Sequence, residues 1–382
     1  MDFDIFIAGD FYVGNHANGR LLPLVEDNNL ETLFGELLPI LRNSKLSIIN
    51  LEAPITDGNS PEIKTGPTLK MPTKIADVLN GAGVDLVCLA NNHILDHGSK
   101  GLENTLRILD EHNISHVGAG TTDIQKSGYF IKTVGEKKIG IINICENEWI
   151  SDKNGIVGAN GLNEIDAFYQ INSLKTLVDF TIVIFHGGNE YYSLPSPRIQ
   201  KIMQYFVDLG ADAVIGHHTH TYSGYEIYNE KPIYYSIGNF IFDSQKKSKG
   251  TYWNIGIGLG ITIKDNKLVF EMVPFKQHAE ALGVTILKNE ELNAFNNNFA
   301  ELNLIISDSE KLKLSYEKFA KQLTVQFQAF INPYEGKFSS LFKKGLLPDL
   351  FTKNKSKLLL NLVRCESHRD VLEIILNNKI KK

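Results

Sequence analysis

The chain has 382 residues, of which 43% are hydrophobic, and a formal net charge of −5 at pH 7. This length allows a large buried core and two domains, since domains commonly contain about 100–200 residues. Residues 289–382 contain 15 Lys and Arg against 11 Asp and Glu, which leaves a net charge of −9 for residues 1–288. No basic stripe lines this larger part, so a nuclease is disfavoured and no nucleic-acid partner is expected.

Short apolar runs typical of buried strands alternate with segments of helical periodicity along the first 280 residues. Strands are predicted at residues 5–8, 46–49, 84–90, 181–185 and 213–215, and helices at residues 30–41, 75–79, 101–109, 165–177 and 199–209. This alternation predicts a largely parallel βαβ framework. In such sheets the carboxyl ends of the strands form the functional site.

The pattern changes toward the carboxyl terminus. Residues 252–275 alternate like an antiparallel hairpin around an Asp265-Asn266 turn, and helical spacing begins near Glu290. We therefore predict one domain at residues 1–280 and a helical C-terminal domain at residues 290–382. The weakly basic charge of the second domain favours a solvated helical surface over a site for polyanions.

Ligand-type side chains follow all five predicted strands, and three histidines crowd after the last one. These side chains are Asp10, Glu52, Asn92 with His93, His186, and the group His217, His218 and His220. Because burying an unpaired polar group is unfavourable by about 1–3 kcal/mol, a bound metal explains the crowding better than the alternative, a hydrogen-bonded surface loop. In an extended segment, His218 and His220 would point to the same side. The mixed oxygen and nitrogen donors suit one or two ions of manganese, iron or zinc.

Two neighbouring features have alternative interpretations. Lys64 lies in a loop rich in Pro and Gly that either holds an anionic substrate group or is simply solvated. Asp96 follows His93 by three residues, so it either orients the imidazole as a hydrogen-bond acceptor or caps a helix.

An ordered set of motifs resembles the bacterial capsule-synthesis family of the CapA, poly-γ-glutamate type, which is similar in fold to the calcineurin-like metallophosphoesterases. The resemblance covers roughly residues 1–280. The motifs are GD at 9–10, NLEAPIT at 50–56, ANNHILDHG at 90–98, HGG at 186–188, GHHTH at 216–220 and YSIGNFIFD at 235–243. The resemblance implies a metallophosphoesterase-like layered α/β/β/α sandwich with a C-terminal helical appendage.

The resemblance also implies roles for individual residues. It assigns Asp10, Glu52, Asn92, His186, His218 and His220 to metal binding, with Glu52 bridging two ions. His93 would face the leaving group of the substrate. Asp96 is its candidate catalytic partner because of the spacing described above, not because of the resemblance. Lys64, His217 and Asn239 are the candidates for substrate binding.

One departure from the family of metallophosphoesterases concerns the first metal position. Tyr12 stands where those enzymes usually carry a histidine, and the bridging residue is Glu52 rather than an aspartate. We therefore expect tight binding at the position made by Glu52, Asn92, His186 and His218. The position made by Asp10, Glu52 and His220 should be weaker or empty.

The function that these features predict is that of a metal-dependent, phosphoesterase-like hydrolase in capsule or exopolysaccharide metabolism. Such an enzyme would hydrolyse or transfer a phosphate ester or related anionic group, on a small molecule or a polymer. The alternative is a non-hydrolytic capsule-assembly protein that binds an acidic polymer, such as poly-γ-glutamate, or a synthase partner. The missing histidine at Tyr12 favours this alternative slightly.

Cysteine usage and the first residues indicate a compartment. Cys88, Cys145 and Cys365 lie far apart without CxxC spacing, which is typical of free thiols in a reducing compartment. The sequence MDFDIFIAGD leads directly into the first strand, and neither a signal peptide nor a transmembrane segment is seen. We therefore expect a cytoplasmic protein.

Overall fold

The structure, a computed structural model, describes residues 2–14, 19–64, 66–151, 155–243, 251–278 and 282–364, together with 372 and 376. The chain divides into two compact units, Met1–Lys313 and Leu314–Lys382. Within the first unit, helix α9 (Asn289–Ile306) buries Phe295, Phe299 and Leu302 in the same hydrophobic cluster as the strands. The sequence pattern does change near residue 289, but helices that follow it contribute to the core of the first unit. The predicted domain limits at 280 and 290 stay a prediction. Cys365 and most residues after 364 lie outside the described residues.

The first unit contains an eight-stranded sheet built around a parallel centre. Its strand order is β16-β15-β14-β1-β2-β3-β4, and β13 also pairs with β1. The strands are β1 (Ile5–Tyr12), β2 (Leu46–Leu51), β3 (Leu86–Cys88), β4 (Ser115–Val117), β13 (Asn239–Phe242), β14 (Ile255–Lys264), β15 (Lys267–Gln277) and β16 (Val284–Ile286). β1 to β4 are parallel, whereas β14 to β16 pair antiparallel. Asp265 and Asn266, both with positive φ, form the predicted turn between β14 and β15.

A second, six-stranded sheet has the order β11-β12-β10-β9-β7-β6. Its strands are β6 (Phe130–Val134), β7 (Lys137–Cys145), β9 (Phe180–His186), β10 (Ala213–His217), β11 (Tyr225–Tyr228) and β12 (Lys231–Tyr234). β7, β9 and β10 are parallel neighbours, so their carboxyl ends lie at one edge. A small pair, β5 (Ala119–Gly120) with β8 (Gly158–Ala159), completes the strands of the described residues.

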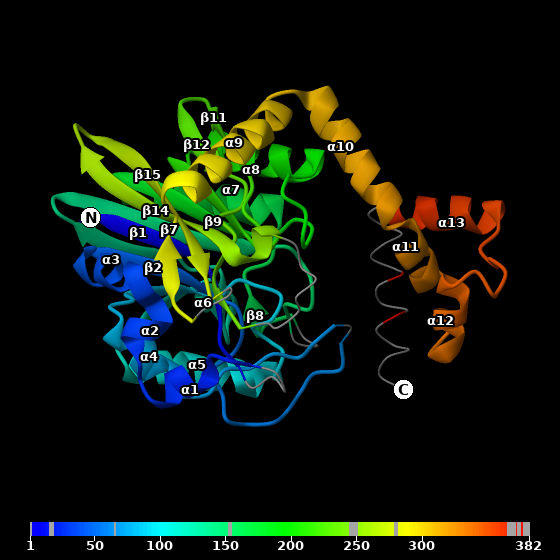
Figure 1. The fold of residues 1–382 in the computed structure, drawn as a ribbon, viewed down its shortest axis with the longest axis horizontal. Helices are drawn as coiled ribbons and strands as arrows, with labels where there is room; N and C mark the ends of the chain where they lie inside the picture. Colours follow the sequence, from blue (N-terminus) through cyan, green and yellow to red (C-terminus); the bar gives the residue numbers. More distant parts are fainter. Residues whose placement is uncertain are drawn as a thin grey trace. The chain divides into compact units, whose positions relative to one another are not determined.

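The two sheets stack, with helices outside each of them, which confirms the layered α/β/β/α architecture (Figure 1). Alternation along β1 shows the layers: Phe6 and Ala8 pack with the first helices, whereas Ile5 and Ile7 pack with the second sheet. The first helical layer contains α1 (Leu22–Glu26), α2 (Leu30–Phe34), α3 (Leu38–Asn43), α4 (Ile75–Gly81) and α5 (Gly98–Glu111). The other side carries α7 (Glu164–Leu174) and α8 (Pro197–Leu209), and the short α6 is Asp123–Lys126.

The prediction of one continuous helix at residues 30–41 is wrong. Residues 30–41 form α2, a short 3₁₀ turn and α3 rather than one helix. Gly35 interrupts the pattern with φ of 50°, and a β-carbon there would lie 2.1 Å from the carbonyl oxygen of Val284. The close approach to β16 therefore determines the backbone conformation at Gly35. The periodicity of apolar residues gives no information about this contact.

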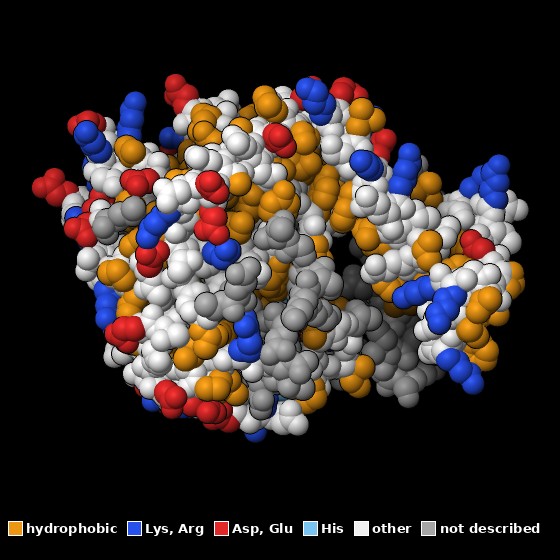
Figure 2. Space-filling view, in the orientation of Figure 1, with side chains coloured by type: hydrophobic (Ala, Val, Ile, Leu, Met, Phe, Trp, Pro, Cys, Tyr) orange, Lys and Arg blue, Asp and Glu red, His pale blue; other side chains and the backbone are white. Residues whose placement is uncertain are grey.

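The second unit is helical, as the spacing predicts. It contains the end of α10 (Ser309–Gln322), then α11 (Thr324–Ile331), α12 (Lys337–Lys343) and α13 (Lys353–Arg364). On the face drawn in Figure 2, hydrophobic side chains lie beside Lys and Arg side chains over these helices. No helix in the described part of the chain combines the length and the apolar character that crossing a membrane requires.

The buried His278 at the end of β15 makes stability depend on pH. Its Nε2 lies 2.8 Å from the carbonyl oxygen of Leu33, and its Nδ1 accepts a 2.9 Å hydrogen bond from the Gly283 N–H, which fixes a neutral imidazole. Burial lowers the pKa of His278 below its ordinary value. The unfolded imidazole takes up a proton near pH 6.5, so acidification through that range favours the unfolded chain.

We therefore expect the free energy of unfolding to fall as the pH drops below about 6.5, by up to about 1.4 kcal/mol per pH unit from this residue. The variant His278→Ala should be less stable at neutral pH but should lose stability less steeply on acidification. Urea unfolding of both proteins across this pH range measures the two slopes. Equal slopes would contradict the assignment.

Candidate metal centre

The parallel strands of both sheets bring polar residues to adjoining edges. In the first sheet, the strand register places Asp10 opposite Asn50 of β2 and Asn239 of β13. In the second sheet, His186 of β9 lies between Cys145 of β7 and His217 of β10. The last residues of β1, β2, β9 and β10 therefore deliver their side chains into one region, as the sequence predicts for strand carboxyl ends.

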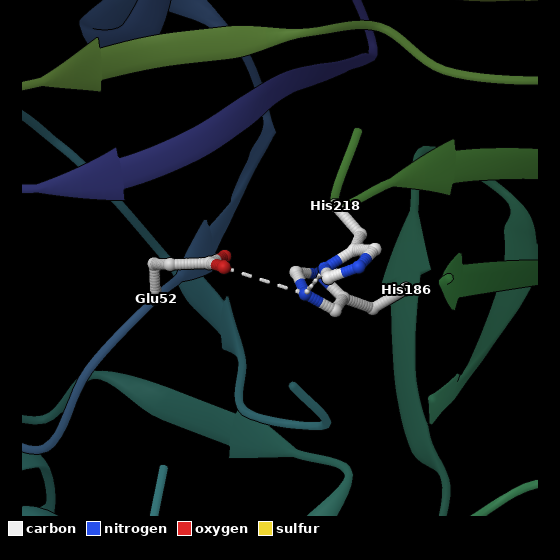
Figure 3. A group of neighbouring side chains, drawn as sticks. All are labelled: Glu52, His186 and His218. Atoms are coloured by element: carbon white, nitrogen blue, oxygen red, sulfur yellow. Dashed lines mark hydrogen bonds and ion pairs between the residues drawn. The ribbon is translucent and has the colours of Figure 1, made fainter. Parts of the chain in front are cut away.

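Four ligand-type atoms meet around the imidazole of His186. Its Nε2 lies 3.3 Å from Glu52 Oε1, 3.2 Å from Asn92 Oδ1 and 3.1 Å from His218 Nδ1. Figure 3 shows the Glu52 carboxylate directed toward the imidazoles of His186 and His218. All four side chains are buried, with at most 7% of their surface exposed. The four residues are those that the sequence assigns to the tighter position.

The chemistry of this group fits a divalent cation. Burial lowers the pKa of both His186 and His218 to about 3, so the two facing imidazoles are neutral. Burial and the nearby Asp10 raise the pKa of Glu52, whose Oε1 has no hydrogen-bond partner. Ligand atoms about 2.0–2.2 Å from one tetrahedral ion would lie roughly 3.4 Å apart, which is close to the distances found here. A cation would satisfy the unpaired oxygen and both imidazoles at once.

Both carboxylate oxygens of Asp10 already have hydrogen-bond partners within the protein. Its Oδ1 accepts from Asn50 at 2.8 Å and lies 3.1 Å from His217 Nδ1, and its Oδ2 accepts from the His218 N–H at 3.2 Å. Burial alone would raise the pKa of Asp10, but the hydrogen bonds from His217 and His220 hold it well below its usual range. Tyr12 packs its ring against Phe242 at 5.1 Å between centroids. The weaker second position at Asp10, Glu52 and His220 stays a prediction.

The expectation that His218 and His220 extend from a strand and point to the same side is wrong. β10 ends at His217, and His218 and His220 adopt left-handed backbone with φ of 88° and 57°. As a result His218 faces His186, whereas His220 Nδ1 lies 2.9 Å from Asn239 Oδ1 and 3.5 Å from Asp10 Oδ2. Burial opposes protonation of His220, but the Asp10 carboxylate raises its pKa overall. The two histidines therefore have different neighbours, His186 for His218 and Asp10 with Asn239 for His220.

His217 and Asn239, expected at the substrate, are buried within the framework of the site. The exposed fractions are 1% for His217 and 0% for Asn239. Asn239 donates its amide to the carbonyl oxygens of His220 and Trp253, at 3.3 and 3.2 Å. Their contacts are those of residues that hold Asp10 and His220 in place.

His93, Asp96 and Lys64 form a second buried group. His93 Nδ1 lies 2.6 Å from Asp96 Oδ2, and the other oxygen of Asp96 pairs with the ammonium of Lys64. Lys64 also donates to the carbonyl oxygen of Asn92 at 3.1 Å. Because α5 begins at Gly98, with His97 as its N-cap residue, Asp96 orients His93 rather than capping the helix. The Lys64 side chain is thus engaged with the protein, although the neighbouring residues of its loop, such as Ile63, are exposed.

Sequence reasoning missed two features of the site. Asn50 donates its amide to both Asp10 and Glu52, and its position near the end of β2, two residues before Glu52, was a usable signal. The second feature is the segment after β7, a strand that the sequence analysis does not predict. Glu146, Asn147 and Glu148 follow this strand directly, as ligand-type residues follow the other strands. These three residues line a pocket of about 260 Å³ together with Asn92, His186 and His218.

The family described as "Bacterial capsule synthesis protein PGA_cap" matches residues 4–244, and this chain belongs to it. The capsule biosynthesis protein CapA of Bacillus anthracis is 29% identical over 247 residues, which cover 62% of this chain and 59% of that protein. The PGA biosynthesis protein CapA of Bacillus subtilis (strain 168) is 30% identical over 240 residues, covering 61% of this chain and 62% of that protein. The match thus spans about three fifths of the length of these relatives.

Solved structures give weaker likenesses. A hypothetical protein from Thermus thermophilus aligns with a TM-score of 0.45 and 15% identity, over 74% of this chain and 99% of that chain. The 5'-nucleotidase of Candida albicans aligns with a TM-score of 0.43 and 12% identity, over 85% of this chain and 59% of that chain.

Proposed function

We propose that this member of the capsule synthesis family is a metal-dependent, phosphoesterase-like enzyme that acts in capsule or exopolysaccharide metabolism. The observation that carries the proposal is the meeting of Glu52, Asn92, His186 and His218 within 3.3 Å of one nitrogen atom, with the His93 and Asp96 pair beside them. The motif order, which is similar to that of metallophosphoesterases, supports the same reaction class.

The four buried residues would hold the ion, and their mixed donor set suits manganese, iron or zinc. When bound, the ion supplies a Lewis acid that stabilises negative charge on the phosphoryl group in the transition state. With the ion bound, Glu52 would supply the negative charge that retains it. Asp10 accepts a hydrogen bond from the backbone N–H of His218 and so holds that segment in place. The chain itself thus provides the orientation on which the reaction depends.

His93 would supply the proton for the leaving group. Attack by a water oxygen forms the new bond to phosphorus, the ester P–O bond breaks, and His93 Nε2 gives its proton to the leaving oxygen. The proton lost by the attacking water returns the imidazole to its starting state through solvent. Asp96, at 2.6 Å from Nδ1, fixes the ring so that Nε2 is the nitrogen that exchanges protons with the substrate.

The second candidate function is non-hydrolytic assembly, in which the chain binds an acidic polymer or other capsule-assembly proteins. The observation that favours it is the saturation of Asp10 by hydrogen bonds together with Tyr12 in place of a histidine, which leaves the second metal position incomplete. In that case the metal would stabilise the fold alone.

Turnover of a generic ester distinguishes these functions. We expect the purified chain to hydrolyse p-nitrophenyl phosphate after loading with manganese, iron or zinc, and to stop when a chelator removes the ion. Release of p-nitrophenol measures the rate, and elemental analysis of the same samples confirms loading. Metal-loaded protein that leaves the ester intact with all three ions would support the assembly function instead.

A further inference from the structure

The pocket beside the candidate metal centre is lined on one side by candidate metal ligands and on the other by side chains with hydrogen-bond acceptor oxygens. Asn92, His186 and His218 belong to the centre, whereas Glu146, Asn147 and Glu148 come from the segment after β7, and Gly187 and Gly188 follow β9. A substrate group attached to a phosphate at the centre would therefore extend toward the segment after β7.

Hydrogen-bond donors near this second wall are used within the protein. The Gly188 N–H donates to Glu146 Oε2 at 2.7 Å, and the Asn147 amide donates to the carbonyl oxygen of Leu162 at 2.8 Å. Arg198 pairs with the other oxygen of Glu146, so the charge of this carboxylate is compensated. Arg198 is not among the residues that line the pocket, so the charged groups on this wall are the carboxylates of Glu146 and Glu148.

Glu148 differs from Glu146 because its charge has no ion-pair partner within the described part of the chain. Its side chain is exposed, and Oε2 lies 3.4 Å from the amide nitrogen of Asn92, a long contact next to His186. An ionised carboxylate accepts hydrogen bonds and donates none, so the ligand group that it binds must be a donor. A positively charged donor gains most, whereas a carboxylate on the ligand would meet a like charge.

We propose that this pocket selects phosphate esters whose alcohol part carries a protonated amine, such as an amino alcohol or amino sugar, and that Glu148 binds the amine. This inference rests on the proposed phosphoesterase function and adds a substrate class to it. It also means that a polyanion such as a polyglutamate chain is a poor occupant of the pocket, because Glu148 repels its carboxylates.

Three esters of similar size test the selection on the full-length, manganese-loaded chain: phosphoethanolamine, ethyl phosphate and phosphoglycolate. We expect kcat/KM for phosphoethanolamine to exceed that for ethyl phosphate by about fivefold, with phosphoglycolate the poorest. The variant Glu148→Gln should remove most of the preference for the amine, and Glu148→Lys should reverse the order. Glu136→Gln, at the exposed turn between β6 and β7, is the matched control and should keep the wild-type preference. Isothermal calorimetry with the same three compounds gives their dissociation constants without turnover.

The outcomes separate this inference from the proposed function. If no ester is hydrolysed, the phosphoesterase function fails, and the calorimetric preference for phosphoethanolamine still decides the role of Glu148. If esters are hydrolysed but the amine gives no preference, or a preference that Glu148→Gln leaves intact, the inference is overturned and the function stands. Loss of bound manganese in Glu148→Gln would make Glu148 a metal ligand and would also overturn the inference.

Discussion

Replacing His186 by alanine should abolish tight binding of a divalent ion. His186 Nε2 is the atom around which Glu52 Oε1, Asn92 Oδ1 and His218 Nδ1 gather at 3.1–3.3 Å, so its loss removes a ligand and leaves a cavity between the others. Loss of an outer-shell partner commonly weakens metal binding by about 10–100-fold, and loss of a ligand should exceed this. Elemental analysis after dialysis, together with calorimetric titration of manganese, measures the change.

Two further variants make this test specific. His116→Ala removes a histidine of β4, whose Nε2 lies near Asp110 and outside the centre, and should keep the wild-type metal content. His220→Ala should affect only weaker binding, because His220 contacts Asp10 and Asn239 rather than the four-residue group. Undiminished metal in His186→Ala, or no metal in any protein under any loading condition, would rule out the proposed centre.

The placement of the site could be predicted because it depends on local patterns. An apolar run followed by Asp10, by Glu52 or by His186 indicates a strand that ends in a ligand-type residue, and parallel pairing brings such ends together. The same reasoning, applied to β7, would have indicated Glu146 and Glu148. Period-two and period-3.6 patterns thus locate the edge of the sheet at which these side chains meet.

The different contacts of His218 and His220 could not be predicted, because they depend on the backbone conformation after β10 ends. His218 and His220 have positive φ, so the alternation rule for extended chains does not describe where their rings point. Gly35 presents the same difficulty in a helix, where contact with β16 rather than periodicity breaks the element. Long-range packing decides both cases.

The environment of Lys64 also lies beyond local sequence patterns. A lysine in a loop containing Pro and Gly is usually solvated, but only 4% of the Lys64 side chain is exposed because it pairs with Asp96. Asp96 is 32 residues away in the sequence. The sequence names both residues without showing that they meet. The pairing holds Lys64 beside His93, whose Nδ1 contacts the same carboxylate.

His93→Ala should lower kcat for an alkyl phosphate by about 10²–10⁴-fold without loss of bound metal. The reason is that His93, held by Asp96 at 2.6 Å, would protonate the leaving oxygen, while none of the four ligand residues is changed. Steady-state kinetics with ethyl phosphate and elemental analysis of the same samples measure the two quantities. His97→Ala is the matched control: it removes an imidazole four residues along, which accepts a hydrogen bond from the Ser60 N–H, and should keep most of the activity.

The dependence on leaving group distinguishes proton donation from a general loss of structure. A nitrophenolate ion leaves without much help from an acid, whereas an alkoxide needs a proton, so His93→Ala should slow ethyl phosphate far more than p-nitrophenyl phosphate. Lys64→Met should produce a smaller version of the same pattern, because it frees Asp96 and the loop that hold His93. Equal losses for both esters would mean that His93 shapes the pocket instead of donating a proton, since a structural defect does not discriminate between leaving groups.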